Sequence, residues 1–137
     1  MDQTEFKRRT RDFALAVITM TDQLPRTPSG DVIGRQLLRS ATSVGANYRA
    51  ACRARSPQEM LAKLSIVEEE ADECLYWFEL TKESQAVVID RFPKIVREAE
   101  EILSMVVASK KTLRTRIARD RDQSTIGNRQ SAIGAGR

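Results

Sequence analysis

The sequence predicts an all-α fold, an up-down-up-down antiparallel four-helix bundle. Apolar residues recur at steps of three, four and seven along four segments, which is the spacing of one face of an amphipathic helix. Only six glycines and four prolines occur in 137 residues, and the long runs rich in alanine, leucine, glutamate and arginine favour helix. Short breaks separate the segments, as they do between antiparallel neighbours in a bundle.

The length and composition predict one globular domain with a core of its own. Hydrophobic residues make up 41% of the chain and charged residues 31%, a balance typical of folded soluble proteins. We expect the four-helix bundle domain to span residues 1–119. Residues 120–137 are polar, rich in glycine, serine and glutamine, and without an apolar period, which predicts a flexible C-terminal tail.

The first predicted helix runs from about Thr4 to Leu24. A breaker with two prolines and a glycine follows, and the second helix is predicted from Asp31, as its N-cap, to about Arg55. Gly45 lies inside this helix, where glycine costs about 1 kcal/mol relative to alanine, so a close packing contact is expected there. The predicted core stripes of the two helices are Phe6, Phe13, Val17, Met20 and Leu24, then Ile33, Leu37, Ala41, Val44, Tyr48 and Ala51.

The start of the third predicted helix is the sharpest local signal in the chain. Ser56 can cap the helix, Pro57 suits its first position, and Glu59 can return a hydrogen bond to the Ser56 amide. We expect this helix to end at Lys82 or Glu83. Its predicted inner stripe is Met60, Leu64, Val67, Ala71, Cys74 and Phe78.

The fourth predicted helix starts near Ala86 or Asp90 and ends near Arg116, because the apolar period thins after Val107. Pro93 fits only near the start of this helix, or else it kinks the helix there. The predicted inner face of the helix is Phe92, Ile95, Val96, Ala99, Ile102, Leu103, Val106 and Val107.

Charge changes sign along the chain, although the total is only +4. Residues 1–55 hold ten Lys/Arg and five Asp/Glu, residues 56–85 hold two and eight, and residues 86–137 hold eleven and six. This asymmetry has two interpretations: charge complementarity between helices inside the fold, or a basic outer face for nucleic acid.

The residue types present argue against enzymatic chemistry. The chain has no histidine, and Cys52 and Cys74 lack Cys-x-x-Cys spacing, so neither a metal site nor a cofactor is expected. Glu70 and Glu73 could in principle act as acid and base, but no nucleophile, metal-ligand set or Gly-rich phosphate loop accompanies them. Ion pairing with the arginine-rich second segment is the more ordinary role for both carboxylates. We therefore expect a protein that is not an enzyme.

Nothing in the sequence predicts a membrane protein. There is no run of about eighteen apolar residues, and the acidic, polar N-terminus lacks the apolar core of a secretory signal. The two isolated thiols fit the reducing cytoplasm, which is the expected location.

Residues of the second and third segments occur together in the order and spacing of one known family: Gln36-Leu37, Ser40-Ala41-Thr42-Ser43-Val44-Gly45-Ala46-Asn47-Tyr48-Arg49, Ser56, Lys63, Ile66, Glu70-Ala71, Glu73, Tyr76-Trp77 and Leu80. From roughly Phe13 to Lys111, the chain resembles this family of small bacterial four-helix bundles. The family includes proteins encoded in intervening sequences of large-subunit ribosomal RNA genes and the accessory variability determinant of diversity-generating retroelements. The resemblance implies a homopentameric ring, no catalytic activity, and a nucleic-acid-binding partner of a reverse transcriptase. This chain departs from the pattern at Ala50, where many relatives have glutamate.

Two hypotheses for function follow, and each has its own residues. In the first, a basic surface binds RNA or an RNA–DNA hybrid through Arg8, Arg9, Arg11, Arg49, Arg53, Arg55, Lys110, Lys111, Arg114 and Arg116. In the second, the protein is an assembly scaffold, and its charges join subunits or dock a protein partner. Residues predicted to be structural or to form the subunit interface are Ser43, Asn47, Tyr48, Lys63, Glu70, Glu73, Tyr76 and Trp77.

Overall fold

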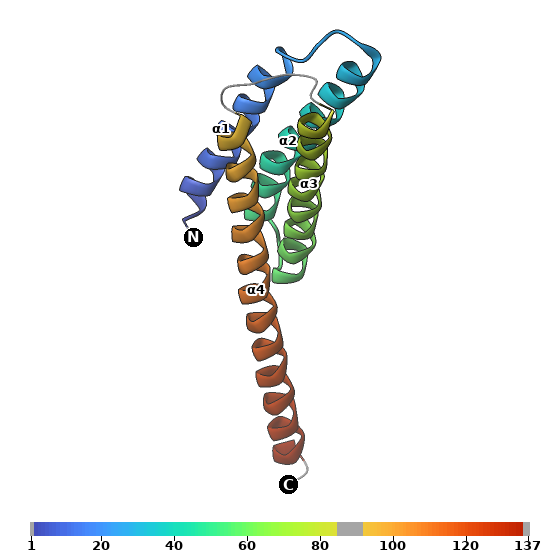
Figure 1. Ribbon diagram of the computed structural model, residues 1–137. Coiled ribbons are helices and arrows are strands. Elements are labelled where there is room, and N and C mark those ends of the chain that lie inside the picture. Colours follow the sequence, from blue (N-terminus) through green and yellow to red (C-terminus); the bar gives the residue numbers. More distant parts are fainter. Residues whose placement is uncertain (1, 85–91, 136–137) are drawn as a thin grey trace.

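Four α-helices make up the described part of the protein. The computed structural model describes residues 2–84 and 92–135, and its helices are α1 (Gln3–Thr21), α2 (Pro28–Cys52), α3 (Pro57–Glu83) and α4 (Phe92–Ala135). The helices pack along one another in one bundle, and no strand occurs in these two ranges (Figure 1). The predicted all-α, four-helix architecture is confirmed. The start predicted for the fourth helix, Ala86 or Asp90, lies outside the described residues.

The starts of α2 and α3 are each fixed by a proline and a capping side chain, and each start differs from the prediction in one respect. Thr27, not Asp31, caps α2: its hydroxyl accepts a 3.1 Å hydrogen bond from the Gly30 amide. Helix α2 starts earlier than predicted because Pro28 suits the first helical turn, where its missing N–H is not needed. Ser56 caps α3 as predicted, but the carboxylate of the third helical residue accepts from the Arg55 amide, one residue before the expected one.

The core lies along the predicted stripes. All five apolar residues predicted on the first helix are buried, although Leu24 lies beyond the end of α1, and most of those predicted on the other helices are buried as well. Val107, predicted on the inner face of the fourth helix, is instead 45% exposed. Edge-to-face aromatic pairs join helices across this core: Phe6 with Tyr48 at 4.6 Å between ring centroids, and Phe78 with Phe13 at 6.4 Å and with Phe92 at 5.8 Å. The stripes therefore set both the burial and the rotation of each helix about its own axis.

Helices α1 and α2 pack closely because Gly45 has no side chain. A methyl group at this position would lie 3.3 Å from the Thr10 hydroxyl of α1. The close packing contact predicted at Gly45 is confirmed. Thr42 and Ala46, on the same side of α2, also have small side chains and are exposed.

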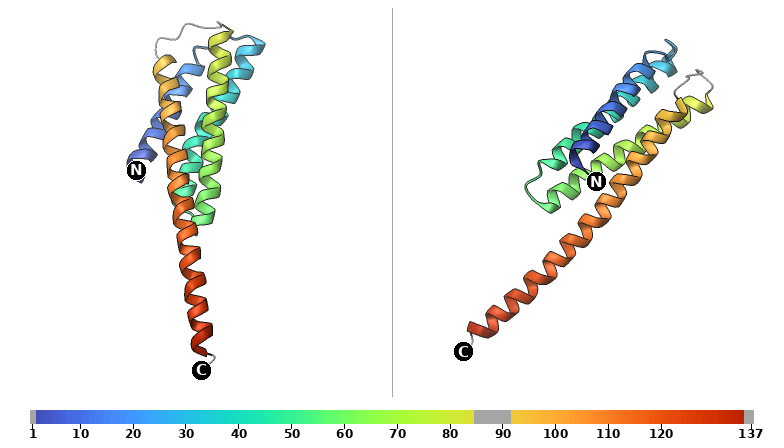
Figure 2. Two further views of the ribbon diagram at one scale, coloured as in Figure 1. Left: turned by 60° about the horizontal axis from the view of Figure 1, so that its bottom comes forward. Right: turned by 90° about the vertical axis from the view of Figure 1, so that its left-hand side faces the viewer.

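Helix α4 extends far beyond the other three helices. It runs to Ala135, and its C-terminal part projects past the ends of α2 and α3 in both views (Figure 2). The expectation of a flexible tail is therefore corrected to a helix for residues 120–135, and residues 136–137 lie outside the described part of the chain. Residues 118–134 are exposed, as the missing apolar period implied. The helix continues nonetheless because no proline stops it, and adding a turn to an existing helix needs no new nucleus.

Candidate nucleic-acid interface

A basic groove runs between α1 and α2. It encloses about 620 Å³ and is lined by Lys7, Arg8, Arg11 and Arg49, with no acidic side chain among the described residues of its walls. The uncharged lining residues are all small: Thr10, Ala14, Thr42, Gly45 and Ala46. Cations therefore line both helices of a groove whose remaining walls consist of small side chains.

Helix periodicity explains how the groove forms. Lys7 and Arg11 are four residues apart and so share a face of α1, while Arg49 lies on the neighbouring helix α2. The close approach of the two helices at Gly45 brings these rows together. Lys7 was not among the predicted nucleic-acid ligands. Its spacing of four residues from Arg11 could have shown that the two cations share a face of α1, but not that this face borders α2.

Three of the predicted nucleic-acid ligands, Arg8, Arg9 and Lys110, form ion pairs with carboxylates. Arg8 and Arg9 lie on α1. The exposed Arg8 pairs within its own helix with Glu5 and Asp12. Arg9 is 24% exposed and reaches α4, where its guanidinium donates to Glu98 at 2.9 Å and Glu101 at 2.6 Å. These hydrogen bonds raise the pKa of Arg9 above its ordinary value.

Lys110, the third, is the clearest correction among these residues. Its side chain is only 9% exposed and pairs with Glu68, so its ammonium joins α3 to α4. Lys110 and Arg9 thus stabilise helix contacts and do not face solvent as nucleic-acid ligands. Lysine at position 110 falls on the buried face of α4, where its long stem packs and its charge finds a partner.

The other seven predicted ligands are exposed, and none of them forms an ion pair with a residue that the structure describes. Three of them follow or end α2, and three lie on α4, a different helix from those of the groove. The ten predicted residues therefore do not form one surface. These exposed cations are Arg11, Arg49, Arg53, Arg55, Lys111, Arg114 and Arg116.

Several residues predicted as structural or interface residues form contacts within the single chain. Tyr48 is buried against the α1 core, and the half-buried Asn47 amide donates to the Ser43 carbonyl oxygen at 2.9 Å. Lys63 is half-buried. Tyr76 differs from these residues, because its side chain is 53% exposed. It is therefore available for a contact with another molecule.

Glu70 and Glu73 hold Arg39 and so join α2 to α3. Arg39 forms ion pairs with both carboxylates, and the Trp77 indole N–H donates to Glu73 at 3.2 Å. The hydrogen bond from Arg39 is the largest cause that lowers the pKa of Glu73. A general acid would need the opposite shift, so this arrangement favours the ion-pair interpretation of the two carboxylates.

No other candidate for chemistry emerges from the described residues. Within residues 2–84 and 92–135, no three His, Cys, Asp or Glu side chains form a group suited to a metal ion. Burial raises the pKa of the Cys74 thiol to about 12, and the thiol donates to the Ser40 hydroxyl at 3.3 Å. A thiol with this pKa stays protonated and is a poor nucleophile.

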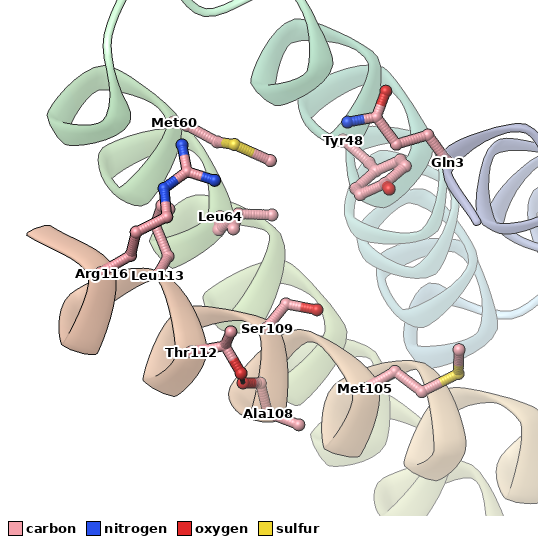
Figure 3. Close-up of a pocket in the computed structure, with 10 residues that line it drawn as sticks. All are labelled: Gln3, Tyr48, Met60, Leu64, Met105, Ala108, Ser109, Thr112, Leu113 and Arg116. Atoms are coloured by element: carbon pink, nitrogen blue, oxygen red, sulfur yellow. Dashed lines mark hydrogen bonds between the residues drawn. The ribbon is translucent and has the colours of Figure 1, made fainter. Parts of the chain in front are cut away.

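A second cleft, of about 490 Å³, opens where α4 separates from the ends of α2 and α3. Figure 3 shows Met60 and Leu64 of α3 and Tyr48 of α2 on one side, with Leu113 and Arg116 of α4 on the other. Most of this lining is apolar. Arg116 is the one charged side chain among the described lining residues, so the cleft lacks the paired ionisable groups of an acid–base site there.

Comparison with known proteins identifies the family. The family model for 23S rRNA-intervening sequence proteins matches residues 2–108. The chain belongs to this family. The resemblance seen in the sequence is confirmed, and α4 continues beyond the matched residues.

One similar solved structure is that of a protein of unknown function from the S23 ribosomal protein family of Bacteroides thetaiotaomicron. It is 30% identical to this chain, with a TM-score of 0.73, and the alignment covers 81% of this chain and 99% of the other. No curated protein matches the chain. Among the described residues, no helix combines the length and apolar character that a membrane span requires.

Proposed function

We propose that the protein is a non-enzymatic nucleic-acid-binding subunit, an up-down-up-down bundle that assembles as a homopentameric ring and holds structured RNA against its basic groove. The observation that carries this proposal is the groove between α1 and α2, with Lys7, Arg11 and Arg49 on its walls and no carboxylate among its described lining residues. Phosphates are the ligands that such a groove favours, because they neutralise the cations and release bound counterions.

The chemistry of the groove predicts affinity without sequence preference. Aromatic residues make up only 5% of the chain, and none of those described lines the groove, so bases have no stacking platform there. The family is named for 23S rRNA intervening sequences, which makes RNA the first ligand to test. An RNA–DNA hybrid would present the same phosphates.

Assembly into a ring would strengthen this weak, backbone-directed binding. Each additional subunit on the same RNA binds at high effective concentration, so several modest sites give one tight complex. Apolar side chains exposed on three helices, Leu15, Ile18, Tyr76 and Val107, are candidates for the contacts between copies.

The resemblance to the retroelement accessory protein makes a reverse transcriptase the protein partner to test. The proposed location is the cytoplasm, where the free thiols of Cys52 and Cys74 would stay reduced.

A double variant of the groove, Arg11→Gln with Arg49→Gln, tests the proposal. Each lost phosphate contact weakens binding by about eightfold at 0.1 M salt, so the double variant should bind an RNA hairpin about 60-fold more weakly. The matched control is Arg26→Gln with Arg35→Gln, which removes two exposed arginines outside the groove lining and changes the net charge equally. Equal losses in the two variants, or no binding by the unmodified protein at low salt, would contradict the proposal.

The scaffold hypothesis is the second candidate, and one observation favours it. Arg9, Arg39 and Lys110 all pair with carboxylates of a neighbouring helix, so this chain does use charge to join helices. Charge reversal, Arg49→Glu with Arg53→Glu, separates the two hypotheses. If nucleic-acid binding is the function, light scattering should show that the oligomer is intact, and the binding assay should show that it no longer binds RNA. A dissociated oligomer would support the scaffold instead.

A further inference from the structure

The C-terminal part of α4, residues 111–135, is a helical arm of which the bundle covers only the first turns. We call it the α4 arm. Its first turns still rest on the bundle through the buried Leu113 and the half-buried Ile117, and residues 118–134 are all exposed. The arm projects beyond the bundle (Figure 2) and lies outside the residues that the family model matches.

The net positive charge of the chain lies on the arm and the two residues that follow it. Residues 1–110 contain sixteen Lys/Arg and seventeen Asp/Glu, a net charge of −1, whereas residues 111–137 contain seven and two, a net charge of +5. Three of the bundle's cations are also held in ion pairs between helices, while no arm cation pairs with any residue in the described ranges. The arm is thus the most electropositive element of the fold.

One face of the arm carries a basic stripe. With 3.6 residues per turn, Lys111, Arg114, Arg121 and Arg129 fall within roughly 80° of the helix circumference, and Asp122 lies just beyond one edge of this sector. The stripe is about 27 Å long at 1.5 Å per residue. Small side chains lie between these cations on the same face, so a ligand can approach the helix closely.

We propose that the α4 arm is a second RNA-binding element, which lies along the phosphate backbone of a double-helical segment of the RNA. The choice of RNA rests on the function proposed above, whereas the surface itself is separate from the groove. Double-helical RNA is recognised mainly through its shape, phosphates and 2′-hydroxyls, and a row of cations on a rigid rod suits this mode of binding. The arm would lengthen the RNA contact of each subunit.

The arm is a poor match for a protein partner. A helix that docks in a protein groove carries apolar anchors at steps of three, four and seven. On the exposed part of the arm the large apolar residues are Ile126 and Ile133, a single pair seven residues apart with no third anchor, and they lie about a quarter turn from the middle of the basic stripe. A methyl group added at Gly127 or Gly134 would meet no atom within 4 Å, so neither glycine marks a close helix contact within the subunit.

The test compares two faces of the arm. The stripe variant is Arg114→Gln with Arg121→Gln, and the matched control is Arg116→Gln with Arg119→Gln, which removes two exposed arginines from other faces. Binding is measured with a 20-base-pair RNA hairpin and with a DNA duplex of the same sequence. We expect the stripe variant to bind RNA about 60-fold more weakly at 0.1 M salt and the control to lose less than about tenfold.

Each other outcome overturns the proposal in a distinguishable way. Equal losses in both variants mean that the stripe is not a defined surface, and unchanged binding in both means that the arm does not contact RNA. Equal affinity of the unmodified protein for the DNA duplex would overturn the assignment to RNA. A changed oligomeric state with unchanged RNA affinity would make a second copy of the chain the partner of the arm. Because the groove variant is measured in the same assay, a loss there without a loss in the stripe variant overturns the role of the arm and leaves the proposed function standing.

Discussion

Arg8 and Arg9 are adjacent in the sequence, each binds two carboxylates, and they should nevertheless differ strongly in their contribution to stability. The side chain of Arg8 is 60% exposed, and both of its partners lie within the same helix. The side chain of Arg9 is 24% exposed, and it connects α1 to α4 through two hydrogen bonds to Glu98 and one to Glu101. Exposure and long-range connection, rather than the number of partners, set the expected difference.

We expect Arg9→Gln to lower the free energy of unfolding by about 2 kcal/mol, because bonds to a charged group contribute roughly 1.5–3 kcal/mol and the exposed partner carboxylate is partly screened by water. With a urea m-value of about 2 kcal/mol/M, the unfolding midpoint should fall by about 1 M. Arg8→Gln should leave the midpoint nearly unchanged, because water screens ion pairs between exposed side chains of one helix.

Urea unfolding followed by circular dichroism measures both midpoints, and RNA binding by the folded variants is measured in parallel. Arg9→Gln should leave RNA affinity unchanged in the absence of urea, because Arg9 is engaged with α4. Equal midpoint shifts in the two variants would refute the reasoning from exposure. Loss of RNA affinity by Arg9→Gln without loss of stability would restore Arg9 as a nucleic-acid ligand.

Three further predictions concern glycine, pH and thiol reactivity. Gly30→Ala should lower the free energy of unfolding by about 1–3 kcal/mol, because the added methyl group would lie 2.0 Å from the carbonyl oxygen of Pro25. Gly127→Ala has open space around it and should instead raise the helix signal in circular dichroism. The folded-state pKa of Glu73 is lowered, so the ionised carboxylate stabilises the fold above the ordinary pKa of glutamate, and this stability is lost as pH falls through the folded-state pKa. In urea unfolding at several pH values, Arg39→Gln should reduce this loss of stability at acid pH. Cys74 should resist alkylation at a pH of about 8 in the folded protein and react once unfolded, and rapid labelling of the native protein at Cys74 would contradict its burial.

The sequence was sufficient to predict that four helices form and which residues make up most of their buried faces, because both depend on local periodicity. The stripe that contains Leu37, Val44 and Tyr48 repeats at steps of three and four, and each of these residues is buried in the bundle. The cap at Ser56 was likewise predictable from four consecutive residues. The prediction that Asp31 caps the second helix was wrong because Thr27 and Pro28 supply a competing start signal one helical turn earlier.

The pairing of Glu70 and Glu73 with the second helix was predicted, but the roles of the other charged residues could not be predicted in the same way. Whether Arg9 and Lys110 face solvent depends on how α1 and α3 are placed against α4, and no local pattern gives that placement. Lys7 joins the groove only because α1 approaches α2 at Gly45. The helical arm was missed for a different reason, since a missing apolar period predicts exposure and does not by itself end a helix.

The salt dependence of RNA binding by the unmodified protein tests the central claim most directly. If the groove and its cations bind phosphates, the logarithm of the association constant should fall linearly with the logarithm of salt concentration, with a slope of about −0.9 for each cation engaged. Lys7, Arg11 and Arg49 alone predict a slope of about −2.7 for each subunit in contact with the RNA. A slope near zero, or no complex with structured RNA at about 50 mM salt, would contradict the account.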